Sequence, residues 1–208
     1  MTNQELAGSY GKHSGMLSEK DKEGSVYWKL FRRFKSWLAE ERAKGEEESP
    51  RQGDFDGFLN SVLSHAERLL GGLGVKILYT FPNRRMGFKE SWKCIRVFEN
   101  QNIYYRIGRT RPRKRVPQGE NLLFIDLVMD GQKRQVFLPL LNLKKEMERE
   151  LGEVIERELP SVEATGKYRF KLFLPFAVVE RREIASVSLK LANFILITKN
   201  TLNRLGVK

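Results

Sequence analysis

The residues of this sequence best suited to chemistry are the cations of segment 84–115, which holds eleven Lys and Arg residues against two acidic residues. The segment therefore carries most of the chain's formal net charge of +12. Clustered cations bind nucleic acid because they release the counterions condensed on its phosphates. We expect these cations to gather at one solvent-facing surface and to bind nucleic acid through Arg84, Arg85, Lys93, Arg96, Arg106, Arg109, Arg111, Arg113, Lys114 and Arg115.

Aromatic residues are interleaved with these cations, and aromatic rings can stack on unpaired bases. They are Phe88, Trp92, Phe98, Tyr104 and Tyr105. The stretch 106–115, RIGRTRPRKR, contains glycine and proline and has no apolar periodicity, which predicts an exposed loop between strands. Two alternatives stay open. The segment binds another acidic partner, or it has no specific role, its charged side chains belonging to a solvent-exposed loop and its aromatic rings to the core. Both DNA and RNA fit this composition.

The sequence contains no pattern typical of a catalytic, metal or cofactor site. Cys94 is the only cysteine, which excludes an internal disulfide and an all-cysteine zinc site. His65 has no further ligands at metal-binding spacing. The GGLG at 71–74 lacks the Lys-Ser/Thr of a P-loop and the spacing of a dinucleotide fold. We therefore predict no catalytic residue, no metal and no cofactor.

Hydropathy and the N-terminal sequence predict a cytoplasmic protein. No apolar run approaches the roughly 18–20 residues that cross a bilayer. The first residues lack the basic start and apolar stretch of a secretory signal. We expect no membrane contact, whereas a protein partner is compatible with the sequence.

The chain divides into a flexible leader, residues 1–24, and a single α+β domain, residues 25–208. The leader is polar and rich in glycine and serine. A first helix is expected over 26–44 with Ser25 as its N-cap, and its aromatic face fits docking against a sheet better than lying on a membrane or nucleic acid. A second helix is expected from Asp54 or Asp56 to Leu70.

The Asp130-Gly131 pair predicts a tight β-hairpin, because it tolerates the positive φ values of a type I′ turn. The first strand, Leu122 to Met129, would place Leu123, Ile125 and Leu127 on one face. The second strand, Gln132 to Leu138, would end before Pro139, which cannot donate to a ladder.

Helical spacing follows the predicted hairpin, with Leu140, Leu143, Met147 and Leu151 on one face. Gly152 is expected to end this helix, and the alternative is a helix that runs on to Glu158. After the stop, 154–159 reads as a short strand.

Further strands are expected at 75–81, 92–99, 103–109 and 168–176, and a final helix at 182–205. The predicted fold class is therefore α+β. It consists of a mainly antiparallel sheet of about six or seven strands packed against N-terminal, middle and C-terminal helices.

Two segments carry a family resemblance. They are SVYWKLF, with Ser25, Tyr27, Trp28 and Phe31, and KEMERELGEVIERELP, from Lys145 to Pro160. Over roughly residues 25–205 the chain resembles an uncharacterised bacterial and archaeal domain often associated with PD-(D/E)XK-type nucleases in restriction- and defence-like proteins. The resemblance implies an α+β domain in a nucleic-acid setting and transfers no catalytic residue.

The first functional hypothesis is a non-catalytic nucleic-acid-binding or accessory protein, in a defence or mobile-element context. A nuclease of the PD-(D/E)XK kind is the second, and it would need an acid on one strand and an (Asp/Glu)-x-Lys triple on the next to hold Mg²⁺. Asp126 could be the first acid, but the expected partner strand has no carboxylate and is expected to satisfy Asp126 through Gln135 and Lys133. A third hypothesis is a protein-interaction module that uses the aromatic helices.

Overall fold

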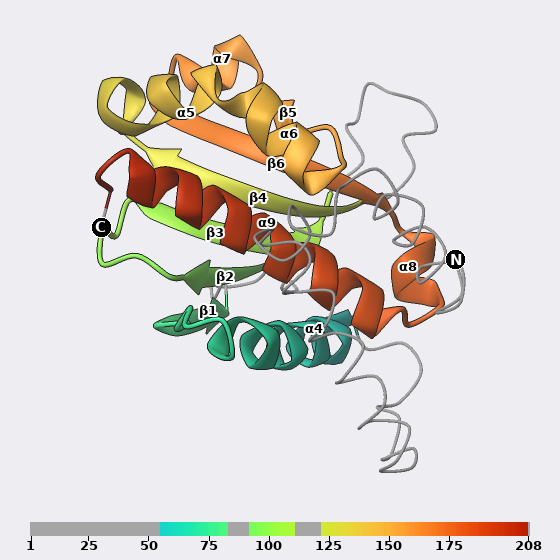
Figure 1. The fold of residues 1–208 in the computed structure, drawn as a ribbon. Helices are drawn as coiled ribbons and strands as arrows, with labels where there is room; N and C mark the ends of the chain where they lie inside the picture. The colour runs from blue at the N-terminus through green and yellow to red at the C-terminus, as the bar shows by residue number, and fades with distance from the viewer. Residues whose placement is uncertain (1–54, 83–91, 111–121, 208) are drawn as a thin grey trace.

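The computed structural model describes residues 55–82, 92–110 and 122–207, and the structural findings refer to these residues (Figure 1). The predicted leader and first helix lie outside them, as do parts of the basic segment. The described residues form one sheet with helices packed against it. No helix within these ranges is long and apolar enough to cross a membrane.

The sheet is antiparallel throughout, with strand order β1-β2-β3-β4-β6-β5. Five strands have four to nine residues: β1 Tyr79–Pro82, β2 Trp92–Arg96, β3 Ile103–Arg109, β4 Leu122–Asp130 and β6 Lys167–Pro175. The two-residue β5, Glu156–Arg157, extends one edge. The α+β class and the antiparallel sheet are thus confirmed. The predicted count of six or seven strands is too high for the described residues, where five strands are longer than two residues.

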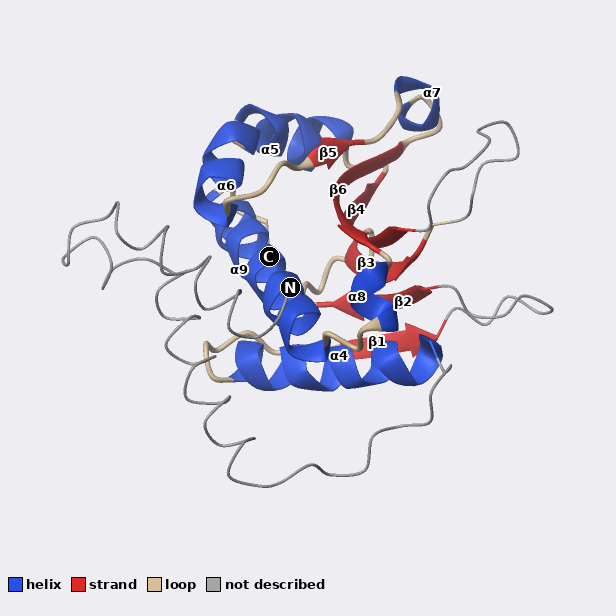
Figure 2. Ribbon diagram, turned by 90° about the vertical axis from the view of Figure 1, so that its right-hand side faces the viewer, coloured by secondary structure: helices blue, strands red, loops and turns tan. Residues whose placement is uncertain are grey.

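Helices cover one face of the sheet, as Figure 2 shows for α4, α5, α6 and α9. The helices of the described residues are α4 Phe55–Gly71, η1 Lys133–Phe137, α5 Leu138–Asn142, α6 Lys144–Leu151, α7 Pro160–Glu163, α8 Ala177–Glu180 and α9 Ile184–Arg204. The second helix and the final helix predicted from periodicity correspond to α4 and α9. The face carrying α9 is the core face.

Strict alternation on the strands separates this core face from the outer face. On β6, Tyr168, Phe170, Leu172 and Leu174 are buried, whereas Arg169, Lys171 and Phe173 are partly exposed. The same alternation puts Tyr105 of β3 in the core, where its hydroxyl lies 2.8 Å from Thr198 Oγ1 of α9. Tyr104, the neighbouring residue, lies on the other face.

The predicted hairpin at Asp130-Gly131 is wrong in its second half. Residues 133–137 form the π-helical turn η1, which leads directly into α5. Gly131 does adopt a positive φ of 70°, but its N–H donates to Gly166 O (2.8 Å) rather than closing a hairpin. Both edges of β4 are occupied by β3 and β6, so no edge is left for a hairpin partner.

The glycine stop after the middle helix is confirmed. Gly152 has φ 73° and ψ 16°, and its N–H donates to Glu148 O (2.8 Å). The left-handed conformation ends α6 because a glycine adopts it without a Cβ clash. The alternative of a helix running on to Glu158 is thereby excluded.

Candidate nucleic-acid interface on the outer face of the sheet

The outer face carries a row of aromatic residues across four strands. Residues directly opposite each other in an antiparallel pair share a face. Trp92 pairs with Gly108, Gly108 with Phe124, and Phe124 with Phe173. The three aromatic residues are partly exposed. We call Trp92, Phe124 and Phe173 the aromatic row; the row belongs to the outer face, whereas α4, α5, α6 and α9 lie against the opposite face of the sheet (Figure 2).

Arg106 lies beside this row, in the middle of the outer face. The centre of its guanidinium group lies 5.2 Å from the centroid of the Trp92 ring and 5.6 Å from that of Phe124. Gly108, which separates those two rings in the row, contributes no side chain. Contacts of this length allow a cation–π attraction between the guanidinium and each of the two rings.

Asp126 of β4 holds the Arg106 side chain in place. The Arg106 Nε donates to Asp126 Oδ1 (3.0 Å), and Nη2 forms a second, shorter contact with Oδ2. Only 1% of the Asp126 side chain and 13% of the Arg106 side chain are exposed. Burial alone would lower the pKa of the Arg106 guanidinium, but the neighbouring Asp126 charge raises it above its ordinary value. The arginine therefore stays charged and oriented at any physiological pH.

A second ionic group lies at the β6 side of the outer face. Glu158 Oε2 lies 2.7 Å from Lys171 Nζ and 3.1 Å from Arg169 Nη1. Burial of Glu158 would raise its pKa, but hydrogen bonds from Lys171 and from the Leu159 N–H lower it. The outer face is therefore rich in charged groups, yet most of its described cations have a carboxylate partner.

Cys94 and Tyr104 also lie on the outer face, and neither is ionised near neutral pH. Burial raises the pKa of the Cys94 thiol to about 11. Burial and the Asp130 carboxylate, which accepts a hydrogen bond from the Tyr104 hydroxyl, raise the pKa of Tyr104 to about 12. A thiol with this pKa is a poor nucleophile because the thiolate is the reactive form.

The described cations of the predicted basic surface do not share one surface. Lys93 lies on the core face of β2, is 6% exposed and forms a salt bridge with Asp56 of α4. Arg96 and Arg106 lie on the outer face of β2 and β3 and are partly exposed. Arg109, at the end of β3, is exposed, and its guanidinium lies 4.8 Å from the Phe176 ring.

The other predicted cations, Arg84, Arg85, Arg111, Arg113, Lys114 and Arg115, lie outside the described residues. The expectation of one solvent-facing group is thus wrong for Lys93, because its strand position points it toward the helices. For Arg106 the expectation holds only in part: the side chain lies on the outer face, but Asp126 balances its charge.

The strand register nevertheless brings the ends of the basic segments together. Segment 83–91 begins after Pro82 and ends before Trp92, and segment 111–121 begins after Thr110 and ends before Leu122. Pro82 pairs with Lys93, Trp92 with Gly108, and the Thr110 N–H donates to Leu122 O (2.8 Å). These strand ends are therefore neighbours at one end of the sheet, the end that also carries the aromatic row.

Sequence reasoning missed part of the outer face. Phe124, Phe173, Arg169 and Lys171 belong to it although they lie outside segment 84–115. Alternation along the strands could have identified Phe124 and Phe173. An aromatic residue on the non-core side of an amphipathic strand does not pack in the core and is therefore a candidate for binding. The pairing of Asp126 was also predicted wrongly, since Arg106 and not Gln135 or Lys133 is its partner.

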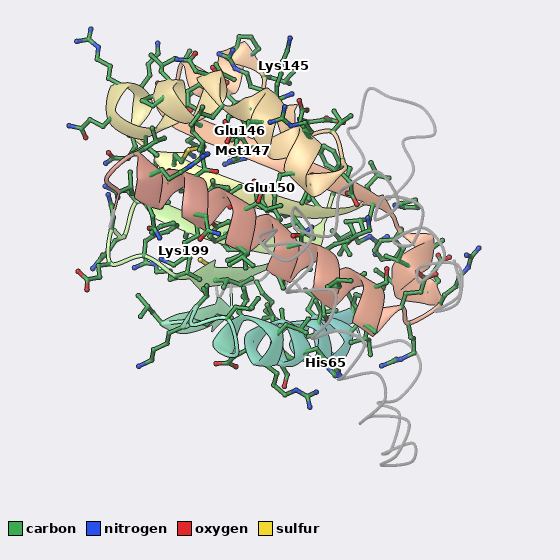
Figure 3. All side chains as sticks on the ribbon, viewed as in Figure 1. His65, Lys145, Glu146, Met147, Glu150 and Lys199 are labelled. Carbon is green, nitrogen blue, oxygen red and sulfur yellow. The ribbon has the colours of Figure 1, made fainter. Side chains whose placement is uncertain are left out.

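The carboxylates and histidine of the described ranges show no metal centre. No group of three or more His, Cys, Asp or Glu side chains there is placed to hold a metal ion. His65 lies on α4 (Figure 3), with Nδ1 2.7 Å from Ser61 O. Asp126, the acid considered for a nuclease site, accepts hydrogen bonds from Arg106.

The second of the two segments that carry the family resemblance, Lys145 to Pro160, has a packing role in the structure. Figure 3 shows Lys145, Glu146, Met147 and Glu150 on α6, where Met147 and Leu151 are buried. Glu148 joins α6 to the chain beyond it, because its Oε1 accepts hydrogen bonds from Lys144 Nζ (2.6 Å) and the Ile155 N–H (2.8 Å).

Together these features define an α+β protein whose antiparallel sheet is covered by helices on one face and presents aromatic and ionic side chains on the other. No protein-family model, curated protein sequence or solved structure matches this chain. The resemblance to the nuclease-associated domain therefore stays a prediction from its two sequence segments.

Proposed function

We propose that this protein binds nucleic acid without catalysing a reaction, at the end of the sheet where the basic segments are attached. The observation that carries the proposal is the strand register, which makes Pro82, Trp92, Thr110 and Leu122 neighbours. Two strongly basic pieces of chain are thus joined to the fold at the same place. The family resemblance adds a defence or mobile-element setting to this proposal.

The distribution of charge supports binding at this end. Segment 83–91 has three cations against one acid, and segment 111–121 has four cations against one acid. On the outer face, by contrast, Asp126 and Glu158 balance most of the charge of Arg106, Arg169 and Lys171. Attraction of phosphates therefore depends on the two segments together with the exposed Arg109, because a balanced ion pair attracts a polyanion only weakly.

The test is a titration of the full chain into fluorescently labelled single- and double-stranded DNA and RNA across a salt series. The variant replaces Arg111, Arg113 and Arg115 by alanine. The matched control replaces Lys133, Arg134 and Lys145 by alanine, since these three cations are exposed and belong to η1 and α6.

Each phosphate contact contributes about 0.7–0.9 to the slope of log K against log salt concentration. We expect the variant to lower this slope by about 2–3 and the control to leave it nearly unchanged. Absence of binding at low salt, or equal losses in the variant and the control, would refute the proposal.

A further inference from the structure

We infer that the aromatic row, together with Arg106, is a stacking surface for unpaired bases, so that the nucleic acid bound is single-stranded. This inference rests on the proposed function and deepens it. It concerns Trp92, Phe124 and Phe173, which the register places in one line across β2, β4 and β6. These three side chains do not pack in the core of the protein, so they are available for binding.

The dimensions of the row fit a short stretch of bases. Neighbouring strands lie about 4.8 Å apart, so the row spans roughly 14 Å from β2 to β6. Aromatic residues on sheet surfaces of RNA-binding domains stack two or three bases. The three rings of the aromatic row are likewise partly exposed on a sheet surface, on the face opposite α4, α5, α6 and α9.

Stacking on such a surface distinguishes single strands from duplexes. In a duplex both faces of each base are covered by its neighbours, and only base edges reach the grooves. A ring on a sheet can therefore contact the face of a base only when that base is unpaired. No base pair needs to be recognised, so the surface predicts little sequence preference.

Arg106 adds a planar cation to the surface, and Asp126 is its positioning residue. Two hydrogen bonds to a 1% exposed carboxylate keep the guanidinium near the Trp92 and Phe124 rings. A guanidinium held in this way can stack on a base and needs no ordering when the base arrives. The surface is thus assembled before binding.

The first experiment compares the affinity of the full chain for oligothymidine and for duplex DNA of equal length. The variant carries Trp92→Leu and Phe124→Leu, which remove the rings and retain apolar bulk. The matched control is Phe55→Leu, a partly exposed aromatic residue on α4. Stacking contributes about 1–3 kcal/mol per base, and each 1.4 kcal/mol is tenfold, so we expect single-strand affinity to fall at least fivefold to tenfold in the variant. The control should retain single-strand affinity.

The second experiment separates base stacking from phosphate attraction and from loss of folding. The tryptophan fluorescence of the unmodified protein is measured with oligothymidine and with an abasic strand of equal length, which has the same phosphates and no bases. We expect quenching by oligothymidine alone, and loss of that quenching in Trp92→Leu. Equal quenching by both strands, or none by either, would overturn the inference.

Failure of this inference and failure of the proposed function give different results. If the inference alone fails, the chain still binds with a salt dependence that the Arg111, Arg113 and Arg115 changes reduce, while the leucine variant binds normally. If the proposed function fails, no nucleic acid binds at low salt.

Discussion

The Asp126→Asn variant should be strongly destabilised, because it leaves a mostly buried guanidinium without its carboxylate. Removal of one partner from a buried ion pair costs about 3–5 kcal/mol. The Arg106 side chain is 13% exposed, so water can reach it and the lower limit of about 3 kcal/mol applies. In a protein of this size, a loss of 1 kcal/mol lowers Tm by about 2–4 °C, so a decrease of about 6–12 °C is expected.

Urea unfolding followed by circular dichroism measures this loss, and two comparisons make it specific. The Arg106→Met/Asp126→Leu double variant should recover most of the stability, because apolar side chains replace both charges. Glu146→Gln is the exposed control: Glu146 lies 2.8 Å from Arg204, and the two side chains are 36% and 57% exposed. It should cost less than about 1 kcal/mol. A loss below 1 kcal/mol for Asp126→Asn, or a double variant no more stable than the single one, would refute the reasoning.

Two further predictions concern the α6 end and the second ionic group. Gly152→Ala should destabilise the protein by about 1–2 kcal/mol in thermal or urea unfolding, because Gly152 has φ 73° and a Cβ is strained in this conformation. Gly71→Ala is the control: Gly71 has no positive φ, so this change should be neutral or slightly stabilising. Because the pKa of Glu158 is lowered on folding, its stabilising effect is present above the unfolded pKa, near 4.5, and is lost as pH falls through the folded pKa. Glu158→Gln should therefore be less stable than the unmodified protein at pH 7, and unfolding curves should converge as pH falls below about 4.5; a pH-independent difference would contradict this.

Much of the local structure could be predicted from the sequence, because it depends on neighbouring residues. The strand pattern at 168–176 located β6, and helical spacing located α4 and α9. The stop at Gly152 followed from its freedom to adopt positive φ. The Asp130-Gly131 pair shows the limit of such reasoning. The same dipeptide can close a hairpin or lead into a helix, and the pairing of β4 with both β3 and β6 decided the outcome.

The sequence alone determined that the chain is basic, that its cations concentrate between residues 84 and 115, and that aromatic residues accompany them. Only the tertiary structure decided which of those charges are balanced. Lys93 forms a salt bridge with Asp56, and Arg106 forms one with Asp126. Each partner is brought close by strand register or helix packing. Composition cannot reveal a charge's environment, because that environment is made by residues distant in the chain.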